Sequence, residues 1–283
     1  MLAGVELGGT KCICTLGTGP DDVRAQVEIP TTSSEQTLAA IAGVLDGWDF
    51  QSLGIASFGP LELDLRSAKF GSILSTPKPG WSGTDLTSIA NGVPFAIDTD
   101  VNGAALAEGL WGAAQGLTSW AYITIGTGVG VGSVSAGQIL RGAGHSEAGH
   151  QRVPKLAGDL FAGCCIYHGD CVEGLASGPA IAARAGKDGR DIAPDDVAWT
   201  HVAHAIAMLC HNLVLTTLPQ RILIGGGVAI GQPQLLTAVR HHLVNSLAGY
   251  RQTDGVENLI VLPGLGERAG PCGSLALASS AAK

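Results

Sequence analysis

The chain has 283 residues, 46% of them hydrophobic, and a formal net charge of −8 at neutral pH. This length predicts about two domains, each long enough to bury its own core. The acidic balance argues against nucleic acid or an anionic membrane as the main partner, because both attract basic surfaces.

The cysteines and the first residues indicate the compartment. The seven cysteines are odd in number and unevenly placed, which is not typical of a disulfide framework. The segment MLAGVELGG has no basic stretch followed by an apolar one, so no signal peptide is expected. We therefore expect a cytoplasmic protein.

A stretch without charged side chains lies between Glu108 and Arg141 and would pass as a membrane span by hydropathy. Glycine interrupts it repeatedly, and its apolar residues form a β-branched run, YITIGTGVGVGSVS. Buried strands joined by a turn have this pattern, so we reject the membrane span.

The N-terminal half predicts strands first and then strands that alternate with helices. Apolar runs at 2–7 and 11–16 flank Gly8-Gly9 and predict a hairpin, which residues 23–29 extend to a meander. The further elements expected are a helix after the cap residues 32–34, a strand at 53–57, a proline-rich loop at 75–81, a short helix at 85–90, a strand at 94–97 and a helix at 103–110.

The C-terminal half repeats this order in part. YITIGTGVGVGSVS again predicts strand, glycine turn and strand, and it is followed by a helix at 202–215, a strand at 221–224 and a helix at 235–247. Two similar halves predict a duplicated α/β fold with a cleft between the halves. We place the two domains at residues 1–109 and 110–283.

Three glycine turns stand at strand ends. The first contains Gly8, Gly9, Thr10 and Lys11, the second Gly126, Thr127, Gly128 and Gly130, and the third Gly225, Gly226 and Gly227. A turn without Cβ atoms lets backbone N–H groups approach an anion, and threonine hydroxyls add donors. Neither of the first two turns has the Walker A or the dinucleotide pattern, and each alone fits a plain hairpin. The occurrence of both at matching points of a repeat favours phosphate binding.

A cluster of metal-ligand residues follows the second turn. Cys165, His168 and Cys171 have the spacing C-x2-H-x2-C, and His150 lies fifteen residues before Cys165. Two thiolates and two imidazoles suit tetrahedral Zn²⁺, and four protein ligands close the coordination shell, so the ion is expected to be structural. Spacing alone also allows Cys164 in place of Cys165, and cysteines are often merely small buried hydrophobes.

Three carboxylates qualify as functional residues. Glu147 and Glu173 flank the expected metal ligands, so the ion would fix both in place. Asp100 stands between a strand and a helix, where a carboxylate could accept the proton of an attacking hydroxyl in phosphoryl transfer. The alternative for Asp100 is a helix N-cap, which spacing alone favours. The histidines at 201, 204 and 211 fall on a helical pattern and are interpreted as surface or core residues.

Several motifs together resemble the bacterial fructokinases of the ROK sugar-kinase family. They are ELGGTK, FGP, STPKPGW, TDVNGAALAE, YITIGTG, GHSEAGH, CIYHGDCVEGLASGPA and ILIGGGV, and their order and spacing match over almost the whole chain. Glu6 and Thr99, where many glucose-specific relatives have aspartate and asparagine, favour the fructokinase branch. Ile166 and Ser146 depart from the family, which has proline at these positions.

The resemblance implies an actin-like, ribonuclease-H-like fold of two domains that close over MgATP and a hexose. It implies transfer of the γ-phosphoryl group of ATP to the 6-hydroxyl of D-fructose, with Mg²⁺ and a structural Zn²⁺ as cofactors and a homodimer as the assembly. The alternatives are a hexokinase for mannose or glucose, a sugar-responsive regulator without catalysis, and a zinc protein without catalysis. A regulator of this family would need a helix-turn-helix segment before the first glycine hairpin.

The resemblance also implies roles for single residues. Asp100 matches the catalytic base, and Glu147, His150 and Glu173 match positions that bind sugar hydroxyls. Gly59 and Pro60 match substrate-binding residues, Gly8–Lys11 and Gly126–Gly128 match the phosphate loops, and Gly225–Gly227 matches the adenosine turn. The zinc ligands of the family match His150, Cys165, His168 and Cys171. This match favours Cys165 over Cys164 as the ligand.

Overall fold

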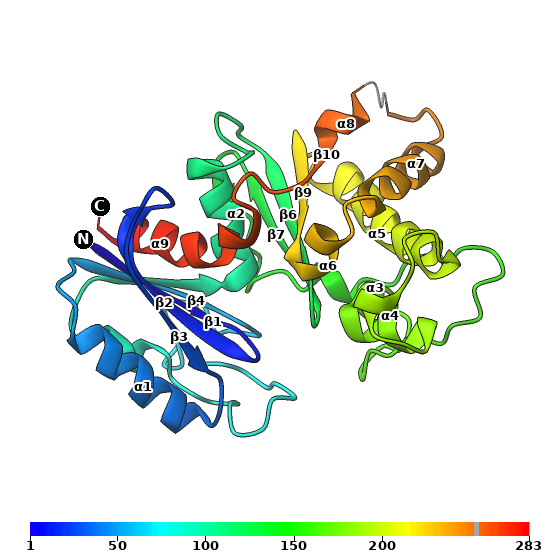
Figure 1. Ribbon diagram of the computed structural model, residues 1–283. Coiled ribbons are helices and arrows are strands. Elements are labelled where there is room, and N and C mark those ends of the chain that lie inside the picture. Colours follow the sequence, from blue (N-terminus) through cyan, green and yellow to red (C-terminus); the bar gives the residue numbers. More distant parts are fainter. Residues whose placement is uncertain (252–254, 283) are drawn as a thin grey trace. The chain divides into compact units, whose positions relative to one another are not determined.

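The computed structural model describes residues 1–251 and 255–282, and the chain forms two compact units (Figure 1). Unit 1 comprises Met1–Gly116, Ile139–Ser146 and the chain from Arg268 onward, and unit 2 comprises Leu117–Gln138 and Glu147–Glu267. This division differs from the two consecutive domains expected at 1–109 and 110–283, because the chain returns twice to unit 1.

Unit 1 contains a five-stranded sheet in the order β3-β2-β1-β4-β5. Its strands are β1 (Leu2–Leu7), β2 (Lys11–Gly19), β3 (Asp22–Pro30), β4 (Ser52–Ser57) and β5 (Phe95–Thr99). β1, β2 and β3 form the predicted antiparallel meander, while β4 is parallel to β1 and β5 is parallel to β4. The carboxyl ends of β1, β4 and β5 therefore meet at one edge of the sheet, where ligands of α/β proteins bind.

Helices cover both faces of this sheet. They are α1 (Ser34–Asp46), α2 (Asp100–Trp111) and α9 (Ala269–Ala281), together with the 3₁₀ turn η1 (Thr87–Ala90). α1 begins after the predicted cap, since the Ser33 side chain accepts from Gln36 N–H at 3.3 Å. It packs its buried Ile41 into the same core as Val5 and Leu7 of β1.

The opposite face of the sheet lies against α9, a helix that the sequence interpretation missed. A Cβ atom on Gly54 would lie 1.9 Å from the Ser274 carbonyl oxygen, and one on Gly4 would lie 2.2 Å from Ser274 Oγ. Glycines on two neighbouring strands thus let the helix lie directly on the sheet backbone. This packing explains why the C-terminal segment belongs to unit 1.

Unit 2 contains a second five-stranded sheet in the order β10-β9-β6-β7-β8. Its strands are β6 (Trp120–Ile125), β7 (Val129–Ser135), β8 (Gln138–Ile139), β9 (Arg221–Gly225) and β10 (Ile260–Val261). Read in reverse, β8-β7-β6-β9-β10, this order corresponds to β3-β2-β1-β4-β5 of unit 1. In both sheets the first strand of an antiparallel hairpin, β1 or β6, is followed by two strands parallel to it. The prediction of a duplicated α/β fold is confirmed; the expected cleft between the halves stays a prediction.

The helices of unit 2 form its core together with the sheet. They are α3 (Val172–Ala176), α4 (Gly178–Ala185), α5 (Val197–Thr216), α6 (Gly226–Gly231), α7 (Leu235–Leu247) and α8 (Val256–Leu259), with the 3₁₀ turns η2 (Ala148–His150) and η3 (Gly189–Asp191). A further turn, η4 (Gly266–Arg268), precedes α9.

Within the described ranges, α5 is the one helix long and apolar enough to cross a membrane, yet 67% of its most apolar window is buried in the protein. A core helix has this character.

Candidate functional site

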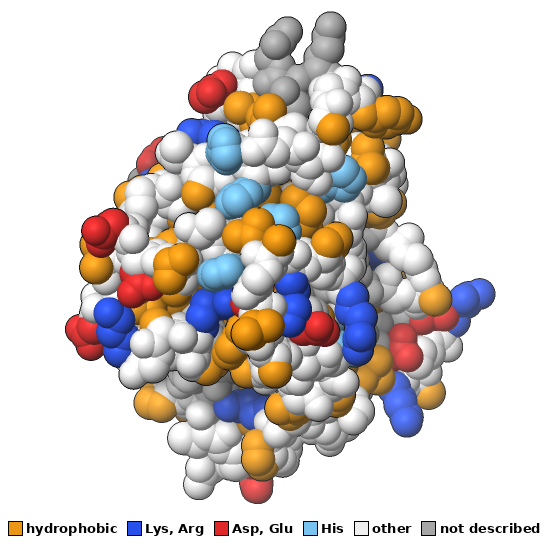
Figure 2. All heavy atoms as spheres, turned by 90° about the vertical axis from the view of Figure 1, so that its right-hand side faces the viewer, with side chains coloured by type: hydrophobic (Ala, Val, Ile, Leu, Met, Phe, Trp, Pro, Cys, Tyr) orange, Lys and Arg blue, Asp and Glu red, His pale blue; other side chains and the backbone are white. Residues whose placement is uncertain are grey.

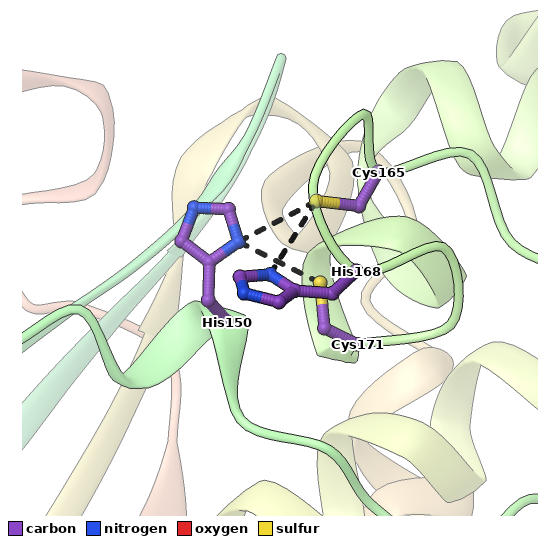
Figure 3. Close-up of side chains that lie close together, drawn as sticks. All are labelled: His150, Cys165, His168 and Cys171. Carbon is purple, nitrogen blue, oxygen red and sulfur yellow. Dashed lines mark hydrogen bonds between the residues drawn. The ribbon is translucent and has the colours of Figure 1, made fainter. Parts of the chain in front are cut away.

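Four potential metal ligands converge in unit 2. The ligand atoms of His150, Cys165, His168 and Cys171 all lie within 4.8 Å of one another, and Figure 3 shows the four side chains pointing to one centre. His150 ends η2, and Cys171 caps α3. The Cys165 and Gly169 backbones exchange two hydrogen bonds of 3.1 and 2.9 Å, which close a tight turn around His168.

The separations of these atoms fit a tetrahedral ion. His150 Nδ1 lies 3.6 Å from the sulfurs of both Cys165 and Cys171, and His168 Nδ1 lies 3.8 Å from Cys165 Sγ. Zn–S and Zn–N bonds of about 2.3 and 2.05 Å place sulfur and nitrogen about 3.6 Å apart in a tetrahedron. Cys164 is exposed and stands outside this group.

Burial, and to a smaller extent the neighbouring Cys165, raise the pKa of the Cys171 thiol to about 11. This thiol is therefore protonated at neutral pH when no cation is close. A bound metal ion would displace the proton and supply the positive charge that the two sulfurs need. The donor set, its spacing and its protonation chemistry all suit a soft divalent cation.

His150 presents its two ring nitrogens to different partners. Nδ1 faces the cysteines, while Nε2 lies 3.9 Å from Glu173 Oε1. This separation is too long for a direct hydrogen bond but leaves room for a hydroxyl oxygen at hydrogen-bond distance from both atoms. One imidazole can therefore serve the metal centre and a ligand hydroxyl together.

The second glycine turn lies against Glu173. Glu173 Oε2 accepts from Val129 N–H at 3.1 Å, and a Cβ atom on Gly128 would lie 2.6 Å from the same oxygen. The turn itself is closed by Gly126 N–H donating to the Gly128 carbonyl at 2.9 Å, and the Gly126 carbonyl accepts from Gly178 N–H of α4 at 2.7 Å. The structure thus brings one phosphate-loop candidate and one sugar-binding candidate together.

The third glycine turn joins β9 to α6. Gly226 has φ +82°, and a Cβ atom there would lie 2.4 Å from the Ile125 carbonyl oxygen. Only glycine fits this left-handed position so close to β6. Gly225 and Gly227 flank it at the carboxyl end of β9, the end at which a ligand would be expected.

The first glycine turn lies in unit 1, between β1 and β2. Gly8 N–H donates to the Lys11 carbonyl at 3.0 Å. Lys78, from the proline-rich loop, donates to the Gly9 carbonyl at 2.6 Å, so a cation stands beside the turn. Lys11 itself pairs with Glu28 at 2.7 Å on the exposed surface. Sequence spacing gave no sign that Lys78 would lie here, 69 residues from Gly9.

Asp100 begins α2 at the carboxyl end of β5, but Thr99 is the helix cap. Thr99 Oγ1 accepts from Asn102 N–H at 3.2 Å, whereas Asp100 Oδ1 accepts from the adjacent Val101 N–H at 2.8 Å. The capping role that spacing favoured for Asp100 is therefore performed by its neighbour. Asp100 belongs to the same sheet edge as the first glycine turn.

Glu6 is a buried carboxylate near this edge. Its Oε2 has no hydrogen-bond partner among the described residues. Burial raises its pKa to about 7; the charge of Asp100 also raises it, while Lys11 lowers it. The Glu6 carboxylate occupies the space that a side chain at position 270 would need, since a Cβ atom on Gly270 would lie 2.1 Å from Glu6 Oε1. A cation near Glu6 and Asp100 would stabilise the negative charge of both carboxylates.

The other sugar-binding candidates lie in two places. Gly59 and Pro60 follow β4 in unit 1 and are joined by a cis peptide bond. The next residue, Leu61, donates its N–H to His145 Nε2 at 2.9 Å. Glu147 precedes η2 in unit 2, and its carbonyl accepts from His150 N–H at 2.9 Å.

The histidines of α5 make structural contacts. His204 Nε2 lies 3.1 Å from the Pro154 carbonyl, and His211 Nδ1 lies 2.9 Å from Ser246 Oγ. The His204 ring also packs edge-on against His242 of α7, with centroids 5.2 Å apart. Figure 2 shows several histidines gathered among apolar side chains on one face.

The whole chain is similar to sugar kinases. The ROK family model matches residues 2–281. A fructokinase of Pediococcus pentosaceus is 40% identical over 100% of this chain and 99% of its own length. A fructokinase of Zymomonas mobilis is 41% identical over 98% of this chain and 96% of its own length.

Solved structures agree with this result. A ROK hexokinase from Thermus thermophilus has a TM-score of 0.80 at 28% identity and covers 99% of this chain and 98% of its own. A ROK family glucokinase from Streptomyces griseus, solved with glucose and AMPPNP, has a TM-score of 0.76 at 25% identity, with 99% of both chains covered.

Proposed function

Since this chain belongs to the ROK family, we propose that it is a fructokinase that transfers the γ-phosphoryl group of ATP to the 6-hydroxyl of D-fructose. The observation that carries this proposal is the similarity, at 35–41% identity over most of the chain, to five proteins named as fructokinases or putative fructokinases. The presence of Asp100 at the carboxyl edge of the unit 1 sheet supports it.

Asp100 is assigned as the base that accepts the proton of the 6-hydroxyl. The Asp100 carboxylate accepts from the backbone N–H of Val101 and lies in the first turn of a helix, so this bond orients it and the helix dipole stabilises its negative charge. Positioning and charge neutralisation supply most of the catalysis in phosphoryl transfer. Asp100 therefore needs a rigid support more than an unusual basicity.

Glu147, His150 and Glu173 are assigned to the sugar hydroxyls. If Nδ1 of His150 held the metal ion, Nε2 would carry the ring proton and could donate it to a hydroxyl, which in turn could donate to Glu173 Oε1. The N–H of Val129 holds Glu173 from the other side. Gly59 and Pro60 of unit 1 are also assigned to sugar binding.

Zn²⁺ is the ion that we assign to His150, Cys165, His168 and Cys171. Four protein ligands leave no position for an activated water, so its chemistry is structural. The metal ion would fix the ring of His150 and the start of α3, which carries Glu173.

MgATP is assigned to the glycine turns. Gly8–Lys11, together with Lys78, and Gly126–Gly128 are assigned to the phosphates, and Gly225–Gly227 is assigned to the adenosine. Mg²⁺ prefers oxygen ligands. The Glu6 carboxylate fits a hard cation nearby, because its buried Oε2 has no hydrogen-bond partner among the described residues and its pKa is raised. When bound, Mg²⁺ neutralises charge on the phosphate oxygens.

A panel of hexoses tests the proposal. Purified protein with MgATP should release ADP at a much higher rate with fructose than with mannose, glucose or N-acetylmannosamine. Discrimination between such sugars depends on one or two hydrogen bonds, worth a few kcal/mol. A preference for mannose or glucose would leave a ROK hexokinase of another specificity, and ADP release independent of every sugar would refute a sugar kinase.

The assembly and the location follow as lesser proposals. We assign a homodimer in the bacterial cytoplasm, where ATP and hexoses are available. Light scattering on a size-exclusion column would test the dimer, and a mass near the 28.6 kDa of one chain would contradict it.

A further inference from the structure

Arg141 contributes to unit 1 from a segment that begins in the other half of the sequence. The segment Ile139–Ser146 begins at the last residue of β8 and packs with unit 1. The Arg141 guanidinium donates to Asp98 Oδ2. Asp98 lies in β5, two residues before Asp100.

Asp98 is a buried charge whose partners are all accounted for. Its side chain is 1% exposed. Oδ1 accepts from the N–H of Thr99 at 2.8 Å and from the side-chain amide of Asn102 at 2.7 Å. Among the described residues, Arg141 is the one cation paired with this carboxylate.

These contacts connect Arg141 with the turn between β5 and α2. Thr99 is the cap of α2, Asn102 lies in the first turn of that helix, and Asp100 stands between them. Both hydrogen bonds on Asp98 Oδ1 therefore hold residues that flank Asp100. A carboxylate has acceptor positions for all three contacts on its two oxygens.

We propose that Arg141 is a positioning residue for phosphoryl transfer: it balances the buried charge of Asp98 and so fixes the turn on which Asp100 stands. The inference rests on the proposed function, because Asp100 matters only as the base. Without Arg141, the buried carboxylate loses its counter-charge and its contact at Oδ2, so it moves toward water. This movement shifts the turn, and a misplacement of about 1 Å can reduce turnover about 100-fold.

The proposal differs from a direct contact between Arg141 and a substrate. The Arg141 side chain is 42% exposed, so it is accessible to ligand as well. If Arg141 acts through Asp98, removing the charge of Asp98 should restore much of the kcat that is lost when Arg141 is replaced. If it binds substrate, the second substitution restores nothing.

The test compares Arg141→Gln, Asp98→Asn and the double variant. Arg141→Gln should lower kcat for fructose about 100-fold with little change in the KM values for fructose and ATP. The double variant, in which two amides face each other without a buried charge, should recover at least about tenfold of that loss. Arg141→Lys, which keeps the charge without the planar fork, should lie between the wild type and Arg141→Gln.

Arg66→Gln is the matched control, since Arg66 forms an ion pair with Asp64 in the same unit while 90% exposed. It should leave kcat unchanged. Circular dichroism and thermal melts establish that each variant is folded. An Arg141→Gln enzyme with kcat within twofold of the wild type, or a double variant no faster than Arg141→Gln, would overturn the inference. A wild-type protein without fructose-dependent ADP release would instead refute the proposed function.

Discussion

The candidate metal cluster of unit 2 and the β5–α2 turn of unit 1 each support a carboxylate that we assign to the proposed reaction, but they do so by different means. Three of the four metal ligands lie within seven consecutive residues, and an ion would hold Glu173 through local chain geometry. The turn that carries Asp100 depends instead on Arg141, 43 residues from Asp98, and on helix α9 at the far end of the chain. Local spacing therefore predicts the first region and not the second.

The two regions should also differ in which kinetic constant they control. The metal cluster supports the groups assigned to the sugar hydroxyls, so damage there should weaken fructose binding. The turn supports the base, so damage there should slow the chemical step. The predictions below separate the two effects, beginning with the largest.

Asp100→Asn should reduce kcat by about 10²–10⁴-fold, because amide cannot accept the hydroxyl proton. The KM for fructose should change little, since the residue keeps its shape and its bond to Val101 N–H. Steady-state kinetics with coupled ADP detection measure both constants. A variant with kcat near that of the wild type would assign the base to another group.

Cys171→Ser should remove the metal ion and lower kcat/KM for fructose by about 10–100-fold, mainly through KM. The reason is that His150 and Glu173 lose their orientation, and hydrogen bonds to charged groups contribute about 1.5–3 kcal/mol each. Elemental analysis should find one zinc per chain in the wild type and none in the variant.

Cys164→Ser is the control for this experiment, because Cys164 is adjacent to the cluster but exposed and outside it. It should keep both the zinc and the activity. Loss of zinc in Cys164→Ser but not in Cys165→Ser would reverse the ligand assignment.

Gly273→Ala should destabilise the protein by about 1–3 kcal/mol, the usual cost of overpacking. The new Cβ atom would lie 2.6 Å from the Gly103 carbonyl carbon, so α9 must move away from α2. Because α2 carries Asp100, kcat should fall while the KM for fructose is kept. Thermal melts and kinetics together check this result.

Gly43→Ala provides the matched helical control. Gly43 lies in α1, and a Cβ atom there meets nothing within 4 Å. Alanine should therefore stabilise the helix by about 0.5–1 kcal/mol. A loss of stability equal to that of Gly273→Ala would show that the α2–α9 contact has no special importance.

Glu6→Gln should change the pH dependence of stability. The raised pKa, about 7 against 4.5, means that the folded protein binds a proton that the unfolded chain has released between these values. The free energy of unfolding should therefore fall as the pH rises from about 4.5 to about 7. In Glu6→Gln this contribution should be absent, so the melting temperature should decline less over that range.

Glu28→Gln removes an exposed carboxylate of the same sheet and is the control. It should show the same slope of melting temperature against pH as the wild type. An equal slope in Glu6→Gln would mean that Glu6 is ionised throughout.

The sequence predicted those parts of the fold that have a local period. The apolar runs at 2–7 and 11–16 and the helical pattern at 235–247 correspond to β1, β2 and α7. The segment of α9, AGPCGSLALASSA, contains two glycines and a proline near its start and is buried on most sides, so it shows neither a cap nor an apolar stripe. Its helical state is stabilised by packing on the sheet, which spacing does not reveal.

The same reasoning applies to the candidate site. Spacing indicated the metal ligands but left Cys164 and Cys165 open, and the structure brings Cys165 into the cluster. The expected short helix at 85–90 is only the 3₁₀ turn Thr87–Ala90. Lys78 and Arg141 were not singled out, because their partners lie 69 and 43 residues away. Long-range ion pairs and contacts of backbone with backbone leave no period in a sequence.

The identity of the product tests the central claim most directly. Phosphorus NMR of a reaction of wild-type protein, MgATP and D-fructose should show fructose 6-phosphate accumulating together with ADP, and the same reaction with Asp100→Asn should show almost none. Fructose 1-phosphate as the product, or equal accumulation of product with the variant, would contradict the account.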